Sequence, residues 1–167
     1  MSALYDYFRA PDSDTAIEWA IGPGGDWRRY STLEEHGADW MDAKNFNPFL
    51  VLGQLIAFAQ GIPFDDLGTE PALVWPDREA WPPGEQRPGQ ESPWDAGPTL
   101  EHVPEEWVNT LADIDDEGVH GLALQWATIE EVSFADVADA EYCIEEFRAL
   151  ARRAREHGQG LYCKAVV

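Results

Sequence analysis

The stretch from Asp136 to Val167, DVADAEYCIEEFRALARRAREHGQGLYCKAVV, predicts a long helix followed by a strand at the end of the chain. Its apolar residues recur at helical spacing and form one stripe: Cys143, Phe147, Leu150 and Ala154. Carboxylates gather in the first half of this helix and arginines in the second, which complements the helix dipole. Gly158 is typical of a helix end, and GLYCKAVV after it is typical of a strand.

Three more short strands are expected in the first half of the chain. LYDYFRA at 4–10 is rich in aromatic residues, and ALVW at 72–75 is a short apolar run that suits a buried strand. The pair Trp40 and Met41 is expected to form another strand. Together with GLYCKAVV, these runs place short strands at both ends of the chain and near its middle.

Four more helices are expected from apolar periodicity and capping residues. They lie at about 12–21, 47–60, 104–114 and 119–129. Asp12 or Ser13 caps the first helix, and Asn47 followed by Pro48 opens the second in the order expected of a cap and a first helical residue. A short acidic turn, DDEG, separates the last two helices of this set.

The order of these elements predicts the α+β class in a single domain over 1–167. We expect a small mixed sheet that includes both terminal strands, packed by about four to five helices. Residues 76–98 hold six of the chain's 12 prolines and are expected to form a long Pro/Trp-rich loop. Trp81 and Trp94 in this loop either fold back as anchors, which is the favoured interpretation, or stay exposed as interface hot spots.

The composition limits the classes of partner. The chain has 32 Asp and Glu against 11 Lys and Arg, a net charge of −21. Nucleic acids and anionic membrane surfaces bind through basic patches, so neither is expected as a partner. The longest apolar run falls short of the roughly 20 residues that span a bilayer. The first residues show no secretory signal, so a cytoplasmic location is expected.

The charge is concentrated in the second half, where residues 88–147 hold 16 carboxylates and no Lys or Arg. The first hypothesis is therefore a non-enzymatic protein that binds a basic protein partner through this half, as an immunity protein or an antitoxin would. The candidate contact residues are the acidic turn and the loop tryptophans: Asp113, Asp115, Asp116, Glu117, Trp81 and Trp94. Acidity as a solubility trait and mimicry of DNA are the competing explanations of the same charge.

Metal and cofactor motifs give no positive indication. The acidic turn begins like a calcium loop, but the twelfth position, which requires a bidentate Glu, is Leu124. The four histidines are scattered singly, and Cys143 and Cys163 lack the spacing of metal ligands. No metal and no cofactor are expected.

The alternative hypothesis is a small-molecule binder or a small enzyme. Trp126 and Glu130 lie four apart, which places them side by side on the expected helix. An aromatic platform beside a carboxylate suits a sugar or a cationic ligand. The favoured interpretation of this pair is that Trp126 packs in the core and Glu130 borders it. We expect such a cleft to be lined by Tyr5, Tyr7 and Trp126, with Glu130 as its polar group. Whether the chain is an enzyme is left open.

The two chain ends carry a resemblance. YDYFRAPD at 5–12 and FRALARRAREHGQGLYCKAVV at 147–167 resemble the ends of a family of small uncharacterised actinobacterial proteins. They are also similar to the YfbM-like family, which begins with a short aromatic strand and ends with a basic helix, a glycine and a terminal strand. The resemblance implies shared terminal elements of the fold and assigns no functional residue.

Overall fold

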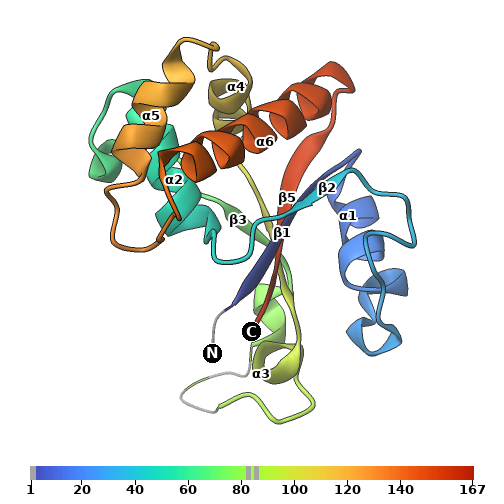
Figure 1. The fold of residues 1–167 in the computed structure, drawn as a ribbon. Coiled ribbons are helices and arrows are strands. Elements are labelled where there is room, and N and C mark those ends of the chain that lie inside the picture. The colour runs from blue at the N-terminus through green and yellow to red at the C-terminus, as the bar shows by residue number, and fades with distance from the viewer. Residues whose placement is uncertain (1–2, 82–83, 85–86) are drawn as a thin grey trace.

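The computed structural model describes residues 3–81, 84 and 87–167. Its centre is a five-stranded sheet in the order β2-β1-β5-β4-β3 (Figure 1). The strands are β1 Leu4–Ala10, β2 Trp40–Asp42, β3 Ala72–Trp75, β4 Thr99–His102 and β5 Gly160–Val166. The helices are α1 Ser13–Ala20, α2 Gly53–Gln60, α3 Pro93–Ala96, α4 Glu105–Ala112, α5 Gly118–Trp126 and α6 Val137–Glu156. The α+β class is confirmed.

The terminal strands pair with each other, as the sequence predicts. β1 and β5 are antiparallel neighbours at the centre of the sheet, with Tyr7 opposite Cys163 and Phe8 opposite Tyr162. All four strand pairs are antiparallel, so the sheet is not mixed. The β4–β5 pair is antiparallel because α4, α5 and α6 return the chain to the end of the sheet that it left, where His102 pairs with Tyr162.

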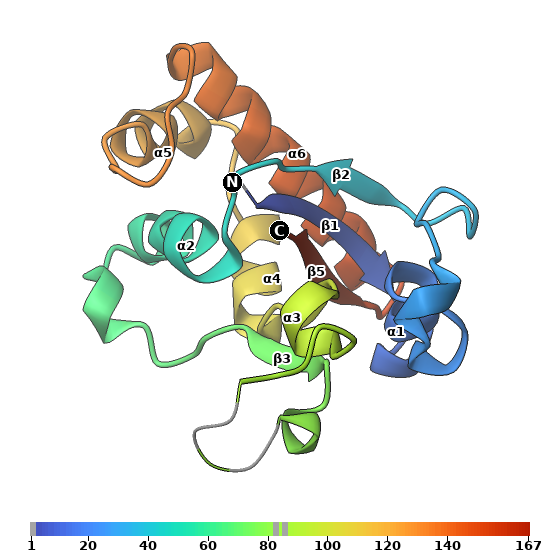
Figure 2. The same cartoon turned by 90° about the horizontal axis from the view of Figure 1, so that it is seen from below.

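The two faces of the sheet carry separate cores (Figure 2). Side chains alternate between the faces along each strand, so β5 sends Leu161 and Cys163 to one side and Tyr162 to the other. The larger core packs Tyr7 and the helices α2, α4, α5 and α6 against the first face. The smaller core packs Phe8 and α1 against the second face.

Local capping explains where the first helices start and stop. The Asp12 carboxylate accepts a hydrogen bond from the Thr15 amide at 2.7 Å and caps α1. The Asn47 side chain accepts from the amides of Phe49 and Leu50 and caps a π-helical turn, Pro48–Leu52, that continues into α2. Gly61 ends α2 with φ of 68°, a left-handed conformation that favours glycine.

Three features differ from the sequence expectation. Residues 76–98 are not irregular throughout, since a 3₁₀ turn at Arg78–Ala80 and the short helix α3 interrupt them. Strand β4 was not predicted, because Leu100 is the one strongly apolar residue in TLEH. The helix expected over 119–129 ends at Trp126, so Ile129 lies beyond it. Within the part of the chain that is described, no helix combines the length and apolar character needed to cross a membrane.

Candidate functional site

The acidic turn between α4 and α5 is held by arginines from α6. The Arg152 guanidinium donates from Nε to the Ala112 carbonyl and from Nη2 to the Ile114 carbonyl, both at 2.9 Å. These carbonyls lie at the end of α4, where the helix dipole favours a cation. Two ion pairs complete this arginine clamp, Arg148 with Asp116 and Arg155 with Asp113, each at 2.7 Å.

The other two carboxylates of the turn are left to solvent. Asp115 is exposed, and its Oδ1 accepts a hydrogen bond from the Gly118 amide at 2.6 Å, which caps the start of α5. Glu117 is exposed as well. Within residues 3–81, 84 and 87–167, neither Asp115 nor Glu117 forms an ion pair. The turn therefore presents uncompensated negative charge beside its two ion pairs.

An open groove of about 530 Å³ lies beside this turn, between α2, α4 and α5. We call it the acidic groove. Its apolar residues are Ala59, Ile114 and Leu122, and its polar residues include Gln60, Asp113 and Asp115. The arginines reach the turn from α6, and no Lys, Arg or His occurs among the described residues that line the groove. An apolar surface edged by carboxylates suits a cationic side chain with an aliphatic stem.

The loop tryptophans lie at the opposite end of the molecule from the acidic turn (Figure 1). Trp94 is half-buried in α3, and Trp81 packs edge-on against it with ring centroids 5.3 Å apart. Trp81 keeps 48% of its surface exposed. The two tryptophans thus pack on each other within the loop, and they do not line the groove beside the acidic turn.

The four residues of the alternative cleft are divided between the core and the surface. Tyr7 and Trp126 are fully buried: the Tyr7 hydroxyl donates to the Phe46 carbonyl at 2.6 Å, and Trp126 Nε1 donates to the Val51 carbonyl at 2.9 Å. Neither ring can therefore offer a face to a ligand from solvent. Because α5 ends at Trp126, Glu130 does not share a helix face with that ring.

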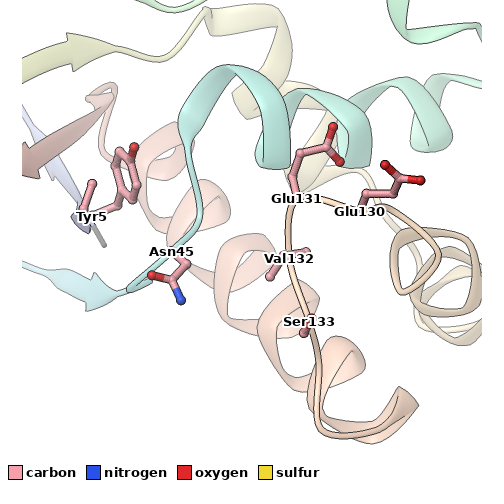
Figure 3. Close-up of a pocket in the computed structure, with 7 residues that line it drawn as sticks. Tyr5, Asn45, Glu130, Glu131, Val132 and Ser133 are labelled. Carbon is pink, nitrogen blue, oxygen red and sulfur yellow. The ribbon is translucent and has the colours of Figure 1, made fainter. Parts of the chain in front are cut away.

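Tyr5 and Glu130 do line one pocket, which is open and has a volume of about 410 Å³. Glu130, Glu131, Val132 and Ser133 follow one another along one wall, and Tyr5 and Asn45 lie across from them (Figure 3). Gln54 Nε2 donates to Glu131 at 2.9 Å, and this hydrogen bond lowers the pKa of Glu131. The pocket is a polar surface hollow without the aromatic platform that the sequence predicted.

Metal and thiol chemistry find little support in this arrangement. No group of three or more His, Cys, Asp or Glu side chains in the described ranges is placed to hold a metal ion. Burial raises the pKa of the half-buried Cys143 thiol to about 11 and also raises that of the buried Cys163 thiol. Both thiols are thus protonated near neutral pH and are poor nucleophiles.

Sequence reasoning missed a cavity of about 330 Å³ at the end of the sheet where β4 stops and β5 starts. His102 and Tyr162 form its inner wall as directly paired residues of these strands. The sequence treats His102 as an isolated histidine, because the pairing depends on β4, which has no clear apolar pattern. A strand prediction over TLEH is the signal that could have found it.

No protein-family model, no curated protein and no solved structure matches this chain. The resemblance of the chain ends to the YfbM-like family therefore stays an untested prediction.

Proposed function

We propose that the protein acts by binding a basic segment of a partner protein in the acidic groove. The observation that supports this proposal is the lining of the groove, which combines Asp113 and Asp115 with the apolar residues Ala59, Ile114 and Leu122. A lysine or arginine of the partner lays its aliphatic stem on the apolar floor and its charged end against the carboxylates. Glu117, which is exposed in the same turn, adds negative charge to this surface.

The charge of the whole chain favours the same partner chemistry. A net charge of −21 attracts a basic protein over distances longer than a contact, and salt weakens this attraction. The three arginines of the clamp offset part of the negative charge at the turn. They reach the turn from α6 and do not line the groove. Of the two carboxylates that line the groove, Asp113 is paired with Arg155, and Asp115 forms no ion pair within the described chain.

The proposal is tested by titrating the labelled protein with a synthetic peptide of alternating lysine and leucine, followed by amide chemical shifts. The expected result is a saturable change at Thr110, Leu122 and Gln125, which line the groove. A peptide of alternating glutamate and leucine should cause no such change. Raising the salt from about 0.05 to 0.5 M should weaken the lysine peptide's binding, because the screening length falls from roughly 14 to 4 Å.

Two variants test whether the lysine peptide binds in the acidic groove. Asp115→Asn removes the charge but keeps a side-chain oxygen that can accept from the Gly118 amide, so the cap of α5 is retained. This variant is expected to lower the affinity for the lysine peptide several-fold. Asp14→Asn, an equal loss of charge on the exposed part of α1, serves as the matched control and should leave the affinity unchanged. Equal effects of the two variants, or shifts spread evenly over all acidic surfaces, would reject the groove as the site.

A further inference from the structure

The cavity at the end of β4 is built by four separate segments. His102 ends β4 and Val103 follows it, Val108 and Asn109 come from α4, and the residues 158–160 connect α6 to the first residue of β5. Pro11, in the turn between β1 and α1, closes the remaining side. Figure 1 shows that β5 begins at the upper end of the sheet, and Gly160, the first residue of β5, is one of the residues that line the cavity. Its volume of about 330 Å³ is at the lower end of the range for small-molecule pockets.

Opposite charges stand on the rim of this cavity. Glu105, at the first position of α4, supplies a carboxylate, and Arg155, near the end of α6, supplies a guanidinium. The guanidinium uses Nη1 in its ion pair with Asp113, which holds the group in place and leaves further N–H donors. No ion pair joins Glu105 to Arg155 within the described chain, so the two charges remain separate.

The inner surface adds neutral hydrogen-bonding groups and an apolar wall. The side-chain oxygen of Gln159 accepts from Arg9, so its amide nitrogen is the group that remains to donate. Asn109 offers both a donor and an acceptor. Val103 and Val108 supply the apolar part of the lining. Such a set can bind both ends of a small dipolar molecule and leave a contact surface for its hydrocarbon part.

His102 and Tyr162 supply the aromatic part of the cavity lining. The centroids of their rings lie 4.9 Å apart. Burial lowers the pKa of His102, which favours the neutral imidazole. A Cβ at position 160 would stand 2.9 Å from His102 Nε2. Glycine at this position therefore lets the imidazole lie against the start of β5.

We propose that this cavity binds a small zwitterion of amino-acid size. The ligand's ammonium group pairs with Glu105, and its carboxylate pairs with Arg155 and accepts from the amides of Asn109 and Gln159. Its side chain packs on Pro11, the exposed apolar residue of the lining, and on the small exposed part of Val108. The cavity shares no lining residue with the acidic groove, although the ion pair of Arg155 with Asp113 joins one residue of each. The cavity therefore adds a ligand to the proposed protein partner.

The test compares three probes by amide and side-chain chemical shifts: L-leucine, L-leucinamide, which lacks the carboxylate, and N-acetyl-L-leucine, which lacks the ammonium group. L-Leucine should cause saturable shifts at Asn109, Gln159 and His102. Each modified probe should bind at least tenfold more weakly, because it leaves one rim charge unpaired. Titration to about 10 mM covers sites with a Kd near 1 mM.

Variants on the rim complete the test. Glu105→Gln and Arg155→Gln should each weaken L-leucine binding about tenfold, the effect of losing a contact worth roughly 1.4 kcal/mol. Glu106→Gln is the control, because Glu106 is the next residue of α4, is exposed and hydrogen-bonds to Gln60 instead. The proposal is overturned if L-leucine causes no saturable shift, if all three probes bind equally, or if Glu106→Gln weakens binding as much as Glu105→Gln.

Discussion

Replacing Arg152 by methionine tests the arginine clamp that holds the acidic turn. Methionine keeps most of the length of the side chain and removes the donors to the Ala112 and Ile114 carbonyls, each at 2.9 Å. A hydrogen bond to a charged group contributes about 1.5–3 kcal/mol when it is well shielded. Arg152 is exposed at the surface, so solvent reduces this contribution. We expect Arg152→Met to lower the free energy of unfolding by about 1–3 kcal/mol in total.

Urea denaturation followed by far-UV circular dichroism measures this change, with the midpoint shifted and the slope unchanged. Arg29→Met is the matched control, because Arg29 is exposed in a 3₁₀ turn and its side chain makes no hydrogen bond or ion pair with the described chain. The control should stay within about 0.5 kcal/mol of the unmodified protein. If Arg152→Met also stays within that range, the clamp does not stabilise the turn and the reasoning is wrong.

Three further predictions concern side chains that are buried or half-buried. Trp126→Phe should lower the free energy of unfolding by about 1–3 kcal/mol in urea denaturation, because it leaves the Val51 carbonyl without its donor; an unchanged midpoint would contradict this. Because burial lowers the pKa of His102, the unfolded state binds its proton more tightly, so His102 reduces stability as pH falls below about 6.5. His102→Gln should therefore lose less stability than the unmodified protein on acidification to about pH 5.5, and equal losses would contradict this. With its pKa raised to about 11, Cys143 should react with iodoacetamide at pH 8 on the order of a hundredfold more slowly than free cysteine, as mass spectrometry of the modified protein can show.

Periodicity and caps were sufficient to predict most elements, because their causes are local. The helix over Asp136–His157 is signalled by its apolar stripe, and the structure caps it with the Asp136 carboxylate, which accepts from the Asp139 amide at 2.8 Å. Strand β4 carries no such local signal. Its half-buried Glu101 and His102 occupy strand positions because β3 and β5 pair with them from both sides. Tertiary pairing overrides the weak local pattern there.

The candidate sites depend on contacts between distant segments, which the sequence does not display. The acidic turn was predicted as an exposed turn, but the clamp joins it to arginines more than 30 positions away. The aromatic cleft of the alternative hypothesis does not form, for a related reason. Tyr7 and Trp126 were expected to line it, yet both find backbone acceptors inside the larger core. Aromatic residues at core spacing pack inside more readily than they form an exposed platform.

The acidic groove can be tested directly by affinity capture from the native lysate with Gly121→Arg and Gly68→Arg. Gly121 lines the groove in α5, and an added Cβ there meets no atom within 4 Å, so arginine places a cation in the groove without a clash at the backbone. Gly68→Arg changes the net charge equally at another open position. The account predicts that the unmodified protein and Gly68→Arg retain the same basic protein at low salt, and that Gly121→Arg loses it. Retention by Gly121→Arg, or equal loss by both variants, would contradict the groove as the binding site.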